Sequence, residues 1–135
     1  MLQDPKVDPS AKDNDAIKVA SENGHLSVVE RLLQISKVVP SAEKNYAIRW
    51  ASGNGHLVVV ERLLKDKRVD PTAKNNYAII YASMYGHLNV VERLLQDKRV
   101  YKSNNYYDIG HASTLAYENE YLRLDKLLED YSHCL

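Results

Sequence analysis

Apolar positions along the chain follow a helical spacing that returns at a constant interval. In the segment 57–64, Leu57, Val60, Leu63 and Leu64 fall at i, i+3, i+6 and i+7, and charged residues take the other side. Such a stripe predicts an amphipathic helix with one face toward a core. A shorter apolar pattern precedes it, so we expect a pair of helices joined by a tight turn.

The segment Gly-His-Leu-x-Val-Val-Glu-Arg-Leu-Leu occurs three times, at residues 24–33, 55–64 and 86–95. The two steps between these segments are equal, so the chain has a constant 31-residue period. Periods of about 20–50 residues are typical of repeat arrays, in which each unit buries its apolar face only against its neighbours. Valine also recurs at the same step, and we expect it to fill the space beneath each connecting loop. The predicted fold class is all-α, a solenoid of stacked helix-turn-helix units.

The repeats divide the chain into parts of one domain. The predicted parts are a remnant of a preceding repeat at 1–9, full repeats at 10–40, 41–71 and 72–102, and a C-terminal capping repeat at 103–135. The remnant leaves two interpretations open, a segment of a longer array or a decayed terminal repeat, and we favour the first. In the capping repeat the Gly-His-Leu signal is lost and the apolar stripe returns at a 33-residue offset. Its polar outer face predicts that the array ends near Leu135.

Composition narrows the partners and the compartment. The 135 residues include 18 basic and 18 acidic side chains, and this balance argues against a nucleic acid or an anionic membrane surface as partner. No apolar run approaches the roughly 18 residues that span a bilayer. The one cysteine, Cys134, allows no internal disulfide, so we expect an intracellular, cytoplasmic location.

The chain offers little catalytic chemistry. His25, His56 and His87 recur at the repeat step, but equivalent positions on stacked helices lie about 8–10 Å apart, whereas metal ligands must lie about 2 Å from one ion. We expect each histidine to hydrogen-bond the loop at a helix start and brace neighbouring repeats. Cys134 has no positioned base beside it. We therefore predict no catalytic residue, no metal site and no cofactor.

The second helix of each unit resembles the ankyrin-repeat family. Gly55-His56, Val59-Val60 and Leu63-Leu64 match the family's motif at its spacing, and the resemblance covers nearly the whole chain. Two features depart from the family: the 31-residue period is shorter than the usual period of about 33 residues, and the Thr-Pro pair that braces each turn is missing. The resemblance implies a solenoid with short β-turn fingers. The 31-residue variant is similar to arrays abundant in large DNA viruses of amoebae.

The resemblance implies a non-catalytic protein–protein interaction module. Members of the family bind partner proteins through a concave face, formed by the turn tips and the exposed side of each first helix. Carried over by alignment, the partner-binding residues are Lys12, Asn14, Glu22, Glu43, Asn45, Asn54, Lys74, Asn76, Met84 and Tyr85. The three units differ at most of these positions, as a recognition surface would, although unconstrained loops also vary. The asparagines at 14, 45 and 76 are also candidates to replace the missing threonine brace.

Tyrosines in the third unit suggest an aromatic patch. Tyr81 and Tyr85 replace more polar residues, and Tyr106 and Tyr107 follow downstream. Tyr and Trp favour interfaces because they combine a large area with a polar tip. The alternative is that Trp50 and Tyr81 only fill gaps between repeats.

Two further alternatives concern other surfaces. The chain is alternatively a structural or self-associating segment of a longer array, because a missing preceding repeat leaves Ile17, Val28 or Leu32 partly uncovered. Separately, the segments 65–68 and 97–99 form a modest basic edge. This edge is either a solvated face or a contact for an acidic partner.

Overall fold

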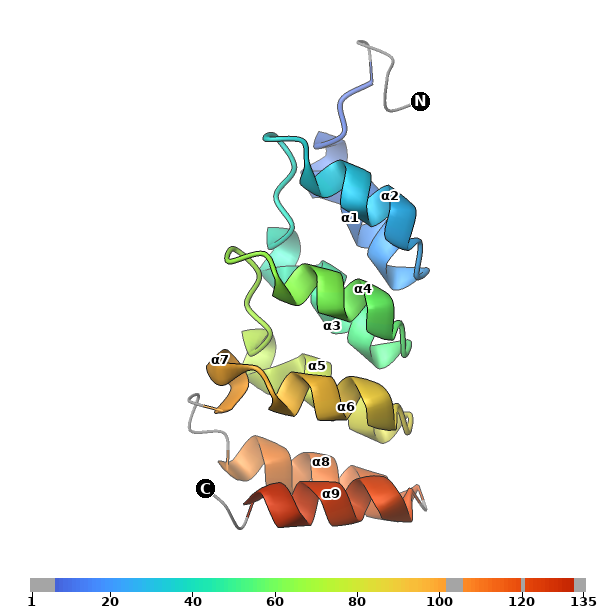
Figure 1. Ribbon diagram of the computed structural model, residues 1–135, viewed down its shortest axis with the longest axis vertical. Helices are drawn as coiled ribbons and strands as arrows, with labels where there is room; N and C mark the ends of the chain where they lie inside the picture. The colour runs from blue at the N-terminus through green and yellow to red at the C-terminus, as the bar shows by residue number, and fades with distance from the viewer. Residues whose placement is uncertain (1–6, 102–105, 120, 133–135) are drawn as a thin grey trace.

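The structure is a stack of helix pairs with no strand in the residues it describes (Figure 1). This computed structural model describes residues 7–101, 106–119 and 121–132, and their side chains except those of 101, 106, 107 and 132. The helices are α1 (Ala11–Glu22), α2 (Leu26–Leu33), α3 (Ala42–Gly53), α4 (Leu57–Leu64), α5 (Ala73–Met84), α6 (Leu88–Leu95), α7 (Lys98–Tyr101), α8 (Tyr106–Glu118) and α9 (Leu122–Ser132). The all-α repeat fold is confirmed, whereas the repeat boundaries stay a prediction.

Each repeat contributes one helix to an inner row and one to an outer row. Helices α1, α3, α5 and α8 form the inner row and pack directly on one another along the stack. The outer helices α2, α4 and α6 contact one another much less. Closer packing on one side curves such a stack toward that side. The exposed surface of the inner row and its loops is called the inner face below.

The core is a continuous column of aliphatic side chains between the two rows. Equivalent positions in successive repeats are fully buried; they are Ile17, Ile48, Ile79 and Ile109 on the inner helices and Leu32, Leu63, Leu94 and Leu128 on the outer ones. The valine expected beneath each loop is buried at 38, 69 and 100 and partly exposed at 7, which lies at the N-terminal end of the stack. Each repeat is thus sealed by the next.

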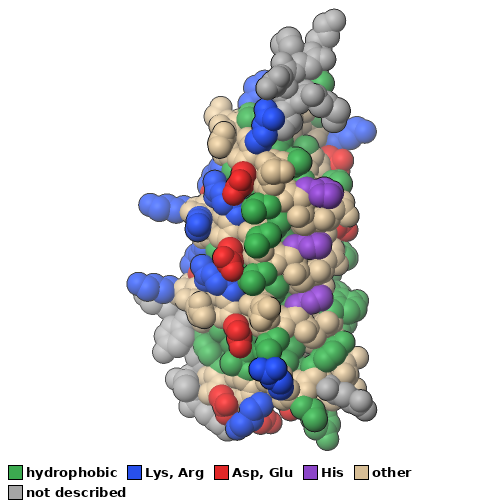
Figure 2. Space-filling model, turned by 45° about the vertical axis from the view of Figure 1, so that its right-hand side comes forward, with side chains coloured by type: hydrophobic (Ala, Val, Ile, Leu, Met, Phe, Trp, Pro, Cys, Tyr) green, Lys and Arg blue, Asp and Glu red, His purple; other side chains and the backbone are tan. Residues whose placement is uncertain are grey.

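The predicted histidine brace exists, but it works by packing. His56 lies against Gly24 of the preceding repeat, and His87 lies against Gly55 in the same way. None of the histidines at 25, 56 and 87 caps its helix with a side-chain hydrogen bond, so the expected hydrogen bond is wrong. The rings form a column beside a band of hydrophobic side chains (Figure 2). Both glycines have positive φ, near +76°, which an L side chain rarely adopts.

The last helix pair, α8 and α9, keeps this joint with a different side chain. The ring of Tyr121 takes the place of histidine against Gly86. The Tyr121 N–H donates to the Ala116 carbonyl at 2.8 Å, as the His87 N–H donates to the Ala82 carbonyl at 2.8 Å. Tyr121 lies one position further from His87 than the predicted 33-residue offset requires, so that offset is wrong by one. A leucine stripe at helical spacing fits either offset, and the ring beneath Gly86 sets the register.

The inner helices α1, α3 and α5 each contain a left-handed turn near their start, which the sequence pattern does not predict. Three consecutive residues have φ of 53–64° and positive ψ in each of these helices; they lie at 12–14, 43–45 and 74–76. The Asn45 N–H closes the turn on the Ser41 carbonyl at 2.9 Å, and the other repeats do the same. L-residues pay about 1–2 kcal/mol each in this region, less for Asn and Asp. Something must therefore hold the turn in place.

The third residue of each turn is an asparagine, and its side chain stabilises the turn with a hydrogen bond. The Asn14 side-chain oxygen accepts the Val39 N–H at 2.7 Å, and the Asn45 oxygen accepts the Asp70 N–H at 2.7 Å. Both bonds run from the turn to the loop that follows the outer helix and leads into the next repeat. The third asparagine, Asn76, donates instead to the carboxylate of Asp108 in the next repeat at 2.9 Å. The asparagines thus tie each turn to a distant segment rather than capping their own helix.

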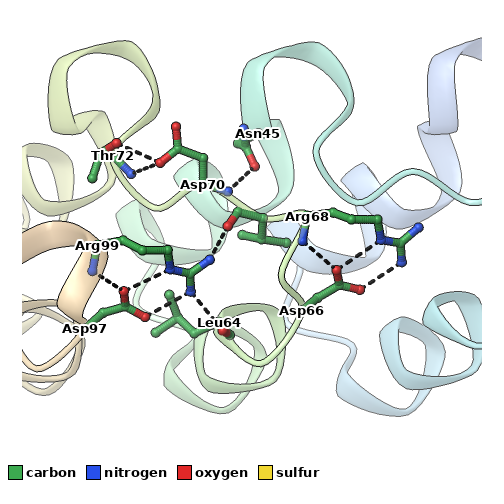
Figure 3. A network of polar contacts seen from close by, with 9 residues as sticks. Asn45, Leu64, Asp66, Arg68, Asp70, Thr72, Asp97 and Arg99 are labelled. Carbon is green, nitrogen blue, oxygen red and sulfur yellow. Dashed lines mark hydrogen bonds and ion pairs between the residues drawn. The ribbon is translucent and has the colours of Figure 1, made fainter. Parts of the chain in front are cut away.

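Two Asp–Arg pairs add a second connection between repeats (Figure 3). Asp66 holds Arg68 at 2.8 Å, and the Arg68 guanidinium donates to the Val38 carbonyl of the preceding repeat at 3.0 Å. Arg99, paired with Asp97, donates to the Leu64 carbonyl at 2.8 Å and also to the Val69 carbonyl. The bond from Arg68 lowers the pKa of Asp66, which partial burial opposes. The predicted basic edge therefore loses both arginines to internal bonds.

We expect Gly55→Ala to destabilise the protein by about 2–4 kcal/mol, since the new methyl group combines positive φ with a steric clash. An ideal Cβ at this position would lie 2.5 Å from His87 Nδ1. Urea unfolding followed by circular dichroism measures the change.

The matched control is Gly110→Ala within α8, where an added Cβ meets nothing within 4 Å. This substitution should stabilise the helix by about 0.5–1 kcal/mol. Equal effects of the two substitutions would contradict the glycine–histidine joint.

Candidate functional site

The inner face carries most of the predicted partner-binding residues, but not all of them are accessible. Lys12, Glu43, Asn54, Lys74 and Tyr85 are exposed. Glu22 and Met84 are half-buried. These seven side chains lie at the loops and along the exposed side of the inner helices.

The prediction that Asn14, Asn45 and Asn76 face a partner is wrong. Their exposed fractions are 6%, 8% and 4%. Each amide is buried because it makes a hydrogen bond to the loop that leads into the next repeat or to Asp108. The same residue recurs at these three positions at the 31-residue step, and this constancy was the available signal for a structural role.

Side chains of the first two repeats form hydrogen bonds with one another across the inner face. The Lys18 ammonium meets the Glu43 carboxylate at 2.8 Å; this bond raises the pKa of Lys18 and lowers the pKa of Glu43. The Tyr46 hydroxyl donates to the Glu22 carboxylate at 3.0 Å. The Asn54 amide donates to the Glu22 carbonyl at 3.0 Å. The two glutamates are therefore already ordered by their neighbours.

Five aromatic side chains form a continuous array on the inner face, which we call the aromatic ladder. It consists of Tyr46 and Trp50 on α3, Tyr77 and Tyr81 on α5, and Tyr85 directly after the end of α5. Neighbours on one helix have ring centroids 3.9–6.1 Å apart, and Tyr77 and Tyr81 stack almost parallel. Trp50 joins the two helices, since its ring lies 6.1 Å from Tyr77 and 6.5 Å from Tyr81.

The rings both fill space and present a surface. The ladder is half-buried at Tyr46, Trp50, Tyr77 and Tyr81, so the rings pack between repeats while keeping an exposed side. Tyr85 at the end of the ladder is 54% exposed. The two interpretations of Trp50 and Tyr81 are thus compatible. The side chains of Tyr106 and Tyr107, also predicted for this patch, lie outside the described residues.

A buried arginine supports the ladder from below, and sequence analysis did not single it out. The Arg49 guanidinium lies 5.8 Å from the Tyr46 ring and 5.0 Å from the Tyr77 ring. It donates to the carbonyls of Lys44 at 2.9 Å and Glu43 at 3.0 Å, within the left-handed turn. The sequence did offer a signal for this role, because Arg49 is a lone charged residue between Ile48 and Trp50 on an inner helix.

The ladder is uncharged at neutral pH. Burial, helped by the neighbouring Tyr81 hydroxyl, raises the pKa of Tyr77 to about 12. Burial and the bond to Glu22 also raise the pKa of Tyr46. Both phenols therefore stay protonated well above physiological pH. The surface they form is aromatic and neutral rather than anionic.

The N-terminal end of the stack has an open apolar hollow of about 580 Å³. Val28 in this hollow is 39% exposed, whereas its equivalents Val59 and Val90, covered by a preceding repeat, are 0% and 1% exposed. The prediction of uncovered core residues is right for Val28. It is wrong for Ile17 and Leu32, which are fully buried because α1 and α2 pack against α3 and α4 beneath them.

No group of three or more His, Cys, Asp or Glu residues within the described ranges is arranged to hold a metal ion. The histidines of neighbouring repeats face glycines rather than one another. Cys134 lies outside the described residues. Across the same ranges no helix has the length and hydrophobicity to cross a membrane.

Comparison with known proteins agrees with this architecture. A family model described as ankyrin repeats in three copies matches residues 17–106. No curated protein matches the chain. The matched segment covers most of the chain and contains the three histidine-bearing turns, the left-handed turns at 43–45 and 74–76 and the whole aromatic ladder. The chain therefore belongs to the ankyrin-repeat family.

Proposed function

We propose that the protein is a non-catalytic module that binds a partner protein through its inner face. Ankyrin repeats are generally protein–protein interaction modules, and the inner face is where these repeats differ from one another. The inner helices are fixed by the core, the asparagine bonds and the glycine–histidine joints. A surface held in this way loses little freedom on binding, which favours affinity.

The aromatic ladder is the observation that carries this proposal. Exposed Tyr and Trp side chains that are already ordered by their neighbours are typical anchors of protein interfaces. The outer helices, by contrast, repeat almost the same residues in each unit. We propose that the partner contacts the ladder together with its exposed or half-buried neighbours, namely Lys12, Glu22, Glu43, Asn54, Lys74, Met84 and Tyr85.

We expect a double substitution on the inner face, Asn54→Ala with Tyr85→Ala, to abolish partner capture. Both side chains are exposed, so the fold should survive. Affinity capture from an extract of the cells that make the protein, followed by mass spectrometry, measures the retained prey. The matched control is Glu30→Ala with Glu92→Ala on the outer helices, where both carboxylates are also exposed.

The control variant should retain its prey at the level of the unchanged protein. Loss of prey from the outer-face variant alone, or equally from both variants, would contradict an inner-face interface. Circular dichroism on both variants confirms that each remains helical.

The setting of this function is also a proposal. The single cysteine favours a reducing, intracellular location, and the balance of 18 basic and 18 acidic residues favours a protein partner over a nucleic acid. The likeness of the 31-residue period to arrays of large DNA viruses of amoebae favours a viral setting.

The open hollow at the N-terminal end favours a second candidate function, self-association. Its apolar lining includes Val19 and Val28, and exposed apolar surfaces of this kind tend to become interfaces. In this alternative the first repeat pairs with another copy of the chain. Another array of the same family would serve equally well.

We expect a self-associating chain to sediment faster as concentration rises, because mass action favours the dimer. Analytical ultracentrifugation at about 10 and 200 μM measures this change. Val28→Asp should then return the sedimentation coefficient to that of a monomer. A chain that is monomeric at both concentrations would exclude this candidate and leave the inner-face proposal standing.

A further inference from the structure

We infer that the aromatic ladder binds an extended, proline-containing peptide segment in the polyproline II conformation. This inference rests on the proposed function and names the kind of partner segment that the inner face takes. Four properties of the ladder support it: its shape, its lack of charge, its free donor and its length.

The shape of the ladder suits an extended chain. Its rings form two short rows that follow the axes of α3 and α5, each ring in contact with the next. Prolyl rings pack well on the faces and edges of Tyr and Trp, and domains that bind proline-rich segments use surfaces lined by such aromatic residues. A polyproline II segment is also stiff before it binds, so little entropy is lost.

The lack of charge favours a neutral occupant. Residues 77–84 of α5 contain no charged side chain. Arg49, the one charged residue of α3 within the ladder, is buried and donates its hydrogen bonds to main-chain carbonyls. In α5 its place is taken by Ile80, a half-buried apolar side chain. Along the stretches 46–53 and 77–84 themselves, neither an acidic nor a basic segment would find an exposed complementary charge.

Arg49 also bears on whether the ladder binds a cationic side chain. Tyr46 already has two cations near its ring, Lys18 at 5.6 Å and Arg49 at 5.8 Å. Arg49 also approaches the ring of Tyr77 at 5.0 Å. These intramolecular cations already make the cation–π interactions that a Lys or Arg of the partner would otherwise make with these rings. An uncharged ring of the partner is therefore the better complement.

Trp50 offers a hydrogen-bond donor to such a segment. In the part of the chain that the structure describes, its indole N–H makes no hydrogen bond, and the side chain is half-exposed. Polyproline II segments have no internal hydrogen bonds, so their carbonyls are available as acceptors. A donor placed among aromatic rings can therefore fix the register of the bound chain.

The length of the α5 row matches one turn of such a segment. The centroid steps from Tyr77 to Tyr81 and from Tyr81 to Tyr85 are 3.9 and 6.1 Å, which limits the row to about 10 Å. One polyproline II turn of three residues advances about 9 Å. Two prolines three residues apart would therefore contact the two ends of the row.

Trp50 makes the inference directly measurable, because it is the single tryptophan of the chain. The experiment titrates the full chain with a polyproline decamer blocked at both ends and records tryptophan emission. Parallel titrations use blocked decamers of alternating Gly and Ser, of Lys and Ser, and of Glu and Ser. We expect a saturable change with polyproline, half-complete below about 1 mM, and none with the other three.

Substitutions at the ladder test the site. Tyr85→Ala should weaken polyproline binding at least tenfold, and Tyr85→Phe, which keeps the ring, should weaken it less. Tyr117→Ala removes a tyrosine that is 65% exposed but lies outside the ladder, and it should leave binding unchanged. Both alanine variants remove exposed side chains, and circular dichroism confirms their fold.

The outcomes separate this inference from the proposed function. Absence of a saturable change with polyproline, tighter binding of a charged or Gly-Ser decamer, or equal loss in Tyr85→Ala and Tyr117→Ala would each overturn it. If the inner-face variant loses its prey while polyproline fails to bind, the module binds a partner of another kind. If polyproline binds as expected but the inner-face variant still captures its prey, the proposed inner-face interface with that prey is wrong instead.

Discussion

The hydrogen bond that the Asp70 N–H donates to the Asn45 side-chain oxygen is the contact on which the geometry of this array depends. It joins the left-handed turn in α3 to the loop that leads into the next repeat, and Asn14 and Val39 form the same bond one repeat earlier. Without it, three L-residues in a strained conformation would have no compensation from that loop. In α1, α3 and α5 the turn sets where the right-handed part of the helix begins, and so which side chains reach the inner face.

The aromatic ladder is a consequence of that geometry. Tyr46 follows Asn45 directly, and Tyr77 follows Asn76, so the first ring of each row stands on the residue after the turn. Arg49 donates to carbonyls inside the turn and lies between Tyr46 and Tyr77. The same residues that hold the strained turn therefore also hold the aromatic ladder. A rigid scaffold with a variable face is the physical basis of the function we propose.

The helical stripes and the 31-residue period predicted the fold, because burial of Leu and Val at helical spacing leaves few alternatives. They did not predict the left-handed turns, since Lys12 and Lys44 have no intrinsic preference for positive φ. The asparagines of these turns were given two roles, partner contact and turn brace, and their hydrogen bonds fit only the second. In the last helix pair, the leucine stripe alone could not fix the offset that Tyr121 sets.

Part of the candidate site could likewise be predicted. Variation between repeats pointed to the inner face and to Tyr85, and the alignment found the exposed residues at 12, 43 and 74. The burial of Arg49 and the contacts among the rings could not be predicted. They depend on the distance between helices of neighbouring repeats, which the sequence of one repeat does not determine. The sequence predicted uncovered apolar residues at the N-terminal end, as Val28 shows. It did not predict how many, because that depends on how fully α3 and α4 cover Ile17 and Leu32.

Native-state amide hydrogen exchange at Asp70 tests the central contact most directly. Asp70 is an exposed residue in a loop, where amides usually exchange fast. The bond to Asn45 predicts that the Asp70 amide is protected, as is the Val39 amide by its bond to Asn14, while the amide of Lys67 in the same loop as Asp70 exchanges freely. An Asp70 amide that exchanges as fast as that of Lys67 would contradict the account.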